Sequence, residues 1–478
     1  MFRPTCFLIC STLLCGVAAA QDNPDAASAP KPFPAELREQ LARVRDAALA
    51  DDYAYGQVSH LTENIGPRIS GSPQSDFAAQ YVADQLREVG LDAKLEKVMV
   101  PRFVRGAETA ELVAWHGQTP GTTQKIIVTA LGNSTATAAE GLTAEVVVVR
   151  NFDELKRLGR ERVANKIVLF NEKFDGRKAQ AGQWGPAYGE AVAYRGDGAK
   201  RAAELGAAAS LVRSVGGADY RLPHTGWSDK AGIPAGAVTA EDADLIAHLV
   251  TQGAVRMKLV LTPQLLPDVP GFNVVADLKG SEHPEQVVVV SGHLDSWDLG
   301  TGAIDDAAGV AVAMEAAQIL QKLHIRPRRT IRVIAWANEE NGGRGSRGYA
   351  EAHAAELPNC VAAIESDLGA GHPLGFETMI NAAGLKWLVP VQETLTPIGA
   401  NILEPSNYPP GADIAALGKA GVPLFGILQD GRTYFNYHHT AADTLDKIVP
   451  SELQENAAAL AVLALALADM PDPLPRGR

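Results

Sequence analysis

Cysteine is scarce in this chain of 478 residues, and its few copies are unevenly placed. The chain has four cysteines, and Cys6, Cys10 and Cys15 all lie within the first twenty residues. Only Cys360 lies beyond that segment, so removal of the segment would leave no pair for an intrachain disulfide. The sequence therefore excludes a disulfide-stapled scaffold and predicts a chain that depends on its hydrophobic core.

An excess of basic residues is also lacking. The chain has 43 Lys and Arg against 56 Asp and Glu, which gives a formal net charge of -13 at pH 7. Because nucleic-acid-binding surfaces are basic, this balance argues against a nucleic-acid partner. The composition is otherwise that of a soluble globular protein, with 46% hydrophobic and 21% charged residues, and the length suffices for two or three domains.

The apolar run at the amino terminus is too short to span a bilayer. Arg3 precedes an apolar stretch over 6–17, and small residues follow at Ala18-Ala19-Ala20. This order predicts a secretory signal peptide over 1–20 that is cleaved near Ala20, with export to the periplasm or the medium and no membrane anchor. Residues 21–33 are rich in Pro, Ala and Asp and are expected to form a disordered leader.

The rest of the chain contains two kinds of sequence pattern. From residue 272 onward, apolar segments alternate with helical patterns, which predicts a mostly parallel central sheet flanked by helices. Residues 111–265 instead contain short β runs broken by glycine, without a cluster of His, Asp and Glu. We therefore predict one α/β domain over 34–110 and 266–470, an inserted β-rich domain over 111–265 that serves substrate access, and a loose tail over 471–478.

The expected elements of the α/β domain follow from apolar runs and helical periodicity. Strands are predicted over 286–293, 330–338, 360–367 and 423–430. Helices are predicted over 306–323, 346–357, 384–395 and 451–470. Ser451 and Gln454 are spaced as a capping box, which predicts the start of the last helix.

Residues that bind metals or protons stand at the ends of these strands. In chain order they are His293, Asp305, Glu339-Glu340, Asp367 and His438-His439. Ligands of such sheets bind beyond the carboxyl ends of the strands, so these side chains are expected at one rim. Each alone has a structural explanation, but their coincidence at successive strand ends favours a site. Histidines and carboxylates without thiolates indicate zinc or a similar divalent metal.

Five motifs at these positions, HLDS, GAIDDAAG, ANEENGGRGS, ESD and HHTAADT, resemble in order and spacing those of the M28 family of dinuclear zinc exopeptidases. The gap of 12 residues (305 − 293) and the paired histidines are most similar to the branch that contains carboxypeptidase Q, also called plasma glutamate carboxypeptidase. The motifs cover 293–444, and the insert resembles the protease-associated domain of such enzymes. The resemblance implies a zinc-exopeptidase fold, two Zn²⁺ per chain, peptide substrates and, from the nearer branch, a homodimer.

Position by position, the resemblance also implies the metal ligands. His293 and Asp367 would hold one zinc, and Glu340 and His439 would hold the other. Asp305 would bridge the two ions. Such a bridge gives a physical reason for a carboxylate among other acids, because the metal charge outweighs their mutual repulsion.

The remaining roles concern proton transfer and orientation. Glu339 would be the general base for a metal-bridging water that attacks the peptide carbonyl. Because neighbouring residues on a strand face opposite sides, the Glu339-Glu340 pair requires the chain to turn at the strand end. Asp295 would orient the ring of His293. His438 is the alternative to its neighbour as a ligand, and Tyr408 is a candidate for stabilising the oxyanion.

The predicted function is that of a secreted exopeptidase that hydrolyses dipeptides or short peptides. Three alternatives share its architecture: a single-zinc glutaminyl-cyclase-like acyltransferase, a non-catalytic binding protein, and a hydrolase of N-acyl amino acids or amides. The complete set of ligand positions favours the two-zinc enzyme. The end of the peptide that is trimmed stays open, and Asp413 is assigned either to the substrate amine or to a helix cap.

Overall fold

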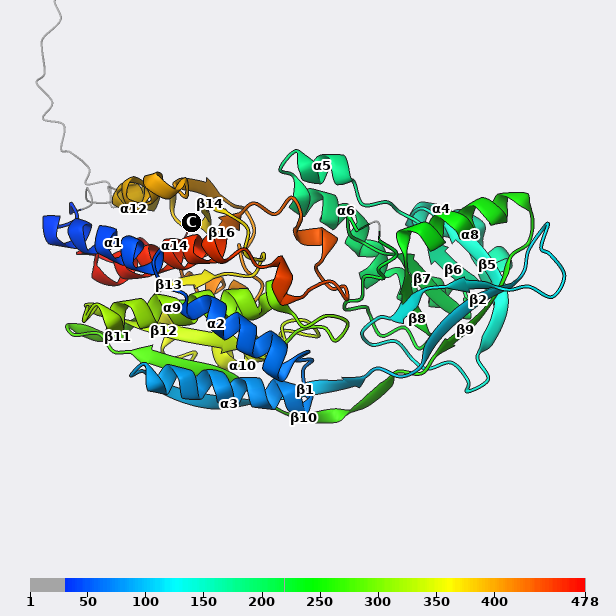
Figure 1. Ribbon diagram of the computed structural model, residues 1–478, viewed down its shortest axis with the longest axis horizontal. Coiled ribbons are helices and arrows are strands. Elements are labelled where there is room, and N and C mark those ends of the chain that lie inside the picture. The colour runs from blue at the N-terminus through cyan, green and yellow to red at the C-terminus, as the bar shows by residue number, and fades with distance from the viewer. Residues whose placement is uncertain (1–30, 219, 478) are drawn as a thin grey trace, which may run out of the picture.

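The computed structural model describes residues 31–218 and 220–477, which form two modules side by side, each built on its own sheet (Figure 1). The predicted signal peptide and most of the predicted leader lie outside the described residues. The chain leaves the larger module after β1 (Asp92–Val104) and returns through β10 (Gln264–Leu278), which pairs with β1. Residues 108–261, here called the inserted module, are therefore an insertion into the larger, main module.

The main module contains an eight-stranded sheet in the order β1-β10-β12-β11-β13-β16-β14-β15. Its central strands β12, β11, β13 and β16 are parallel, which confirms the predicted α/β arrangement, whereas β1–β10, β10–β12 and β14–β16 are antiparallel. The further strands are β11 (His283–His293), β12 (Arg329–Trp336), β13 (Cys360–Glu365), β14 (Pro373–Met379), β15 (Ile402–Pro405) and β16 (Leu424–Gln429).

The consecutive valines of β11, residues 287–290, point alternately to the two faces of this sheet and pack against helices on both. Val288 and Val290 pack in one hydrophobic cluster with residues of α9 (Ala308–Lys322) and α14 (Pro450–Asp469). Val287 and Val289 pack in another with residues of α10 (Arg344–Ala352) and α13 (Ala415–Gly418). Successive side chains of a strand point to opposite faces, so an unbroken valine run needs apolar partners on both.

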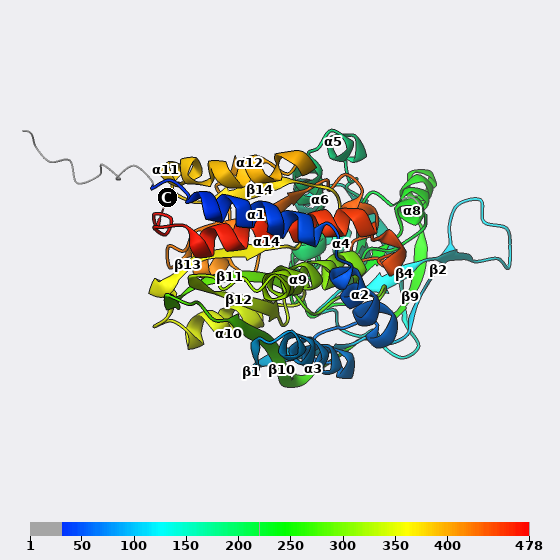
Figure 2. The same cartoon turned by 60° about the vertical axis from the view of Figure 1, so that its left-hand side comes forward.

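Further helices complete the main module, and α1 lies along α14 in both views (Figure 2). No helix within 31–218 and 220–477 is long and apolar enough to cross a membrane. These further helices are α1 (Ala35–Ala48), α2 (Tyr53–Ser59), α3 (Pro73–Glu88), α11 (Ala382–Leu385) and α12 (Val389–Leu395).

The start of α14 corrects one prediction. Pro450 occupies the first helical position, Val449 precedes it as the N-cap, and no side chain caps the helix. Ser451 therefore lies inside the helix, and Gln454 instead donates a hydrogen bond to the Asp51 carbonyl at 2.7 Å. The capping-box prediction is wrong because proline, whose φ suits the first turn, already defines the helix start.

The inserted module has a second eight-stranded sheet, in the order β3-β2-β9-β5-β6-β7-β8-β4. Strands β5 to β8 are parallel neighbours, and five α-helices in the described part of the module accompany the sheet, so the module is mixed α/β. Its strands are β2 (Glu108–Ala114), β3 (Gln124–Ile126), β4 (Val128–Ala130), β5 (Leu142–Val149), β6 (Ile167–Phe170), β7 (Ala209–Arg213), β8 (Ala235–Val238) and β9 (Arg256–Leu261). Its helices are α4 (Phe152–Val163), α5 (Gly176–Gln180), α6 (Trp184–Gly196), α7 (Gly198–Glu204) and α8 (Ala240–Gln252).

Candidate metal centre

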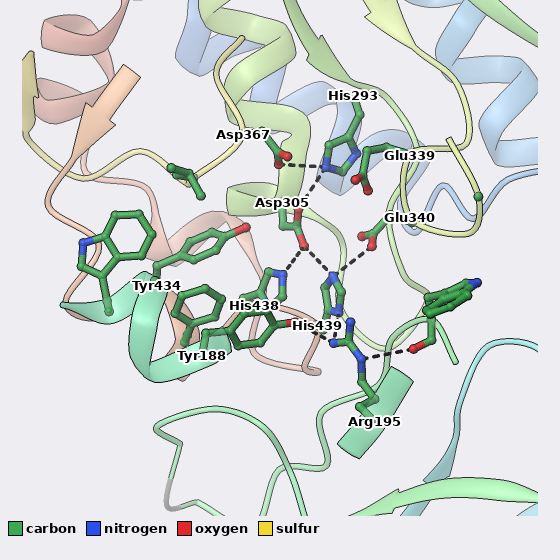
Figure 3. Close-up of a pocket in the computed structure, with 16 residues that line it drawn as sticks. Tyr188, Arg195, His293, Asp305, Glu339, Glu340, Asp367, Tyr434, His438 and His439 are labelled. Atoms are coloured by element: carbon green, nitrogen blue, oxygen red, sulfur yellow. Dashed lines mark hydrogen bonds and ion pairs between the residues drawn. The ribbon is translucent and has the colours of Figure 1, made fainter. Parts of the chain in front are cut away.

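The ligands predicted from the strand ends lie together at the carboxyl edge of the main sheet (Figure 3). His293 is the last residue of β11, and Asp367 lies two residues after the end of β13. Glu340 comes from the turn after β12, and Asp305 from the turn before α9. His439 comes from the loop between β16 and α14. Parallel strands thus deliver side chains from distant parts of the sequence to one edge.

Two groups of ligand atoms form around Asp305. His293 Nε2 lies 3.1 Å from Asp305 Oδ1 and 3.1 Å from Asp367 Oδ1. His439 Nε2 lies 3.1 Å from Asp305 Oδ2 and 2.9 Å from Glu340 Oε2. Two ligands of one tetrahedral zinc, each ~2.0 Å from the ion, stand about 3.3 Å apart. Each oxygen of Asp305 therefore stands at metal-ligand spacing from a different histidine, and Glu340 also lies within ligand range of His293 and Asp305.

Some carboxylate oxygens of this cluster have no hydrogen-bond donor, although histidine nitrogens lie near Asp305 Oδ2. Asp305 Oδ2 and Glu340 Oε1 are buried and accept no hydrogen bond from any described residue. Burial raises the pKa of Glu340 to about 7. Burial alone would lower the pKa of His439, but the neighbouring Glu340 and Asp305 raise it to about 9. The cluster therefore attracts positive charge, and its donor set fits divalent cations.

The two adjacent aspartates of the GAIDDAAG motif have different partners. Asp306 accepts the backbone N–H groups of His293 and Gly309, both at 2.9 Å, and is fully buried. Asp443 accepts two further N–H groups of the same turn, at 2.7 and 2.8 Å. The peptide bond between Asp305 and Asp306 is cis. Of the pair, Asp305 lines the cavity, whereas the carboxylate of Asp306 holds the turn through backbone N–H groups and lies within metal-ligand spacing of His293 and Asp367.

Asp295 contacts the site through two different groups. Its main-chain carbonyl accepts a hydrogen bond from His293 Nδ1 at 2.9 Å, which leaves Nε2 of that ring for a metal. Its carboxylate accepts the backbone N–H of Glu339 at 3.0 Å and the hydroxyl of Ser70 at 2.9 Å. The carbonyl therefore orients the ring, and the carboxylate fixes the segment that carries Glu339.

The turn required for the Glu339-Glu340 pair is present after β12. Asn338 and Gly343 have φ values of +62° and +58° in the left-handed region, and Gly342 has +140°. Both glutamates line the same cavity as a result. Non-glycine residues with positive φ are concentrated at functional sites, and His439, with φ +58°, is another example here.

The inserted module contacts the paired histidines directly. The Thr225 carbonyl accepts a hydrogen bond from His439 Nδ1 at 3.3 Å, and the Thr225 N–H donates to the His439 carbonyl at 3.0 Å. His438 stacks on His439 with ring centroids 3.6 Å apart and places its Nδ1 3.2 Å from His224 Nε2. His438 Nε2 is 3.4 Å from Asp305 Oδ2, farther than the 3.1 Å of His439. His439 therefore has the better ligand geometry of the two.

A cavity of about 530 Å³ opens over these side chains, and both modules line it. Three of its polar residues were not predicted from the sequence: Tyr434 from the main module, and Tyr188 and Arg195 from α6 of the inserted module. The aromatic run TYFNYHH is the signal that indicates Tyr434. No motif or periodicity relates α6 to residues some 240 positions later, so Tyr188 and Arg195 had no comparable signal.

Two other candidates lie away from the cavity. Tyr408 is 79% exposed and is absent from the cavity lining. Asp413 is 1% exposed, and its backbone N–H donates to Glu365. Helix α13 has Ile414 as its N-cap and no side-chain cap, so Asp413 neither lines the cavity nor caps this helix.

Comparison with known proteins agrees with this geometry. Residues 273–464 match peptidase family M28. Carboxypeptidase Q of Xenopus laevis is 37% identical over 436 residues, which cover 89% of this chain and 88% of that protein. The family match and this relative identify the class of protein as a metallo-exopeptidase. The chain belongs to peptidase family M28.

Solved structures extend the comparison to the whole fold. The crystal structure of a peptidase M28 precursor from Shewanella amazonensis SB2B has a TM-score of 0.87 and 34% identity, with 93% of this chain and 99% of that chain covered. A zinc aminopeptidase from Bacillus subtilis has a TM-score of 0.61 at 22% identity, with 86% of this chain and 93% of that chain covered, and shares the fold. Both modules therefore have counterparts in known structures.

Proposed function

We propose that this chain is an exported exopeptidase that binds two zinc ions and hydrolyses dipeptides or short peptides. One observation carries the proposal: the two oxygens of Asp305 each stand at ligand distance from a separate histidine, and each of these histidines stands at ligand distance from a second carboxylate. Relatives named carboxypeptidase Q and a zinc aminopeptidase of the same fold support the substrate class and the metal.

In this proposal His293 and Asp367 hold one zinc, Glu340 and His439 hold the other, and Asp305 bridges them. The buried oxygens without hydrogen-bond partners on Asp305 and Glu340 fit this assignment, because a cation would compensate them. When bound, the two cations would polarise the scissile carbonyl and lower the pKa of the attacking water.

Glu339 is the proposed general base. Its carboxylate lines the cavity beside both ligand groups and belongs to neither. Burial, with the adjacent acids Asp367 and Glu340, raises its pKa well above the usual range, which favours proton uptake. Glu339 would take the proton of the attacking water and deliver it to the leaving amine.

Tyr434 is the proposed donor to the oxyanion that forms on the scissile carbonyl. Its phenol lines the cavity and is directed toward Asp305 (Figure 3). Burial, together with Asp305 and Asp367, raises the pKa of Tyr434 well above its ordinary value. The phenol therefore stays neutral and keeps its O–H for donation.

The proposal also covers the organisation of the chain. The main module would be the catalytic domain, and the inserted module would correspond to a protease-associated-like domain. Cleavage near Ala20 would release the mature chain, which would assemble as a homodimer.

Hydrolysis of a dipeptide panel before and after chelation tests the proposed function. We expect cleavage that falls by at least about 100-fold on chelation and returns when zinc is added back, since the metals activate water and polarise the carbonyl. Cyclisation of amino-terminal glutamine without peptide cleavage would instead indicate the single-zinc acyltransferase. Absence of cleavage with zinc fully loaded would indicate a binding protein.

A further inference from the structure

A buried arginine from the inserted module faces the candidate metal centre. Arg195 lies in α6, is 8% exposed and lines the cavity (Figure 3). Among the described residues that line this cavity, it is the only lysine or arginine. Its Nη1 lies 3.3 Å from the His439 ring, so the guanidinium sits directly behind a proposed metal ligand.

The contacts of Arg195 hold the side chain in place without neutralising it. Nη1 donates to the Tyr188 hydroxyl at 2.7 Å and to the Thr225 carbonyl at 3.4 Å, and Nε donates to the Trp227 carbonyl at 3.3 Å. No ion pair joins it to a carboxylate of the described residues, and Nη2 has no acceptor among them. A buried cation without an anion is unfavourable, so an anion is expected to bind there.

The charge of the loaded centre leads to the same conclusion. Four acids line the cavity: Asp305, Glu339, Glu340 and Asp367. Two divalent cations would offset the charge of these four acids (−4 + 4 = 0), so the lining acids of the loaded centre would not compensate the guanidinium. An arginine fork matches the planar geometry of a carboxylate and can bind it through parallel hydrogen bonds.

Tyr188 adds a second donor beside Arg195. Its ring stacks on Phe435 with centroids 4.1 Å apart, which fixes its position. Burial raises the pKa of Tyr188 to about 12, so the phenol is neutral. Because its oxygen already accepts from Arg195, its O–H is left to donate to a ligand in the cavity.

We propose that Arg195, assisted by Tyr188, binds the free α-carboxylate of the peptide substrate, so that the enzyme selects dipeptides and short peptides by their carboxyl end. The inference rests on the proposed function and deepens it. In a dipeptide one residue, about 3.6 Å when extended, separates the scissile carbonyl from the carboxylate. Arg195 lines the same cavity as the proposed metal ligands, with Nη1 3.3 Å from the His439 ring, so a carboxylate one residue beyond the scissile carbonyl falls on the side of the site where Arg195 lies. The inserted module thereby determines whether the amino or the carboxyl end of a peptide is recognised.

The experiment compares a carboxylate with a carboxamide in otherwise identical ligands. Binding of a non-cleavable dipeptide isostere, with a methylene-amine in place of the peptide bond, is measured by calorimetry on the zinc-loaded protein. The cleavable dipeptide and its C-terminal amide are assayed in parallel. We expect the free acid to bind about 10- to 100-fold more tightly than the amide, the range of charge-assisted hydrogen bonds.

Arg195→Gln should bring the ratio of acid to amide affinity close to 1, because it weakens binding of the acid and leaves binding of the amide unchanged. In the hydrolysis assay it should raise KM for the acid more than it lowers kcat. Arg195→Lys should restore part of the preference, because it keeps the charge without the fork. Arg177→Gln, at an exposed arginine of α5, is the matched control and should keep the wild-type ratio. Circular dichroism of each variant checks that it folds.

The outcomes separate this inference from the proposed function. An acid preference that survives in a folded Arg195→Gln protein would overturn the role of Arg195. Equal binding of acid and amide by the wild type would overturn it as well, even if both peptides are cleaved. Loss of the acid preference only in Arg195→Gln supports it, and the calorimetric ratio gives this result even if no peptide is hydrolysed.

Discussion

Replacement of Glu339 by glutamine is expected to lower kcat by about 10²- to 10⁴-fold, the usual contribution of a general base. The amide keeps the shape of the side chain but cannot take a proton from water. Glu339 belongs to neither ligand group, so the metal content should not change. The check combines steady-state kinetics on a dipeptide with elemental analysis of the same sample.

The control for this variant is Glu351→Gln, at an exposed glutamate on α10 that should leave both quantities unchanged. If Glu339→Gln kept more than a tenth of wild-type kcat, Glu339 would not be the base. If it lost metal together with activity, Glu339 would be a ligand, and the assignment of the two neighbouring glutamates would have to be exchanged.

Asp305→Asn should have a second large effect, because it affects both proposed metals at once. Asparagine offers one neutral carbonyl oxygen where aspartate offers two charged ones, so a single substitution removes the bridge. We expect the protein to retain less than one zinc per chain after dialysis against a weak chelator, with a loss of activity on the order of 10³-fold.

Asp306→Asn is the matched contrast at the next residue. Both oxygens of Asp306 accept backbone N–H groups, so its amide should lower the free energy of unfolding by about 1–3 kcal/mol. Urea unfolding of the zinc-free proteins measures this difference.

Full zinc retention by Asp305→Asn would exclude Asp305 as the bridge.

Much of the site follows from the sequence because parallel strands bring their carboxyl ends to one edge. His293, Asp367 and the glutamate pair could be placed there from apolar runs alone, since each stands where such a run stops. The position of Asp305 followed in the same way from the helix after β11. This reasoning depends on the regular α/β part of the chain, where sequence order and spatial order are closely related.

Other features depend on contacts that no local pattern encodes. Arg195 and Tyr188 reach the cavity only because the inserted module packs against the loop that carries Phe435 and His439. The contact of Asp295 with the His293 ring is made by a main-chain carbonyl, which side-chain identity does not indicate. The sequence offered Tyr408, and not Tyr434, as the oxyanion donor because the position of each depends on loop conformation, which the strand and helix periods do not determine.

Zinc content per chain of the purified native protein, measured by mass spectrometry after extensive dialysis, tests the two-metal centre most directly. The geometry around Asp305, with one ligand group at each of its oxygens, predicts two zinc ions per chain. A value of one, unchanged when zinc is added in excess, would contradict the bridge and the mechanism built on it.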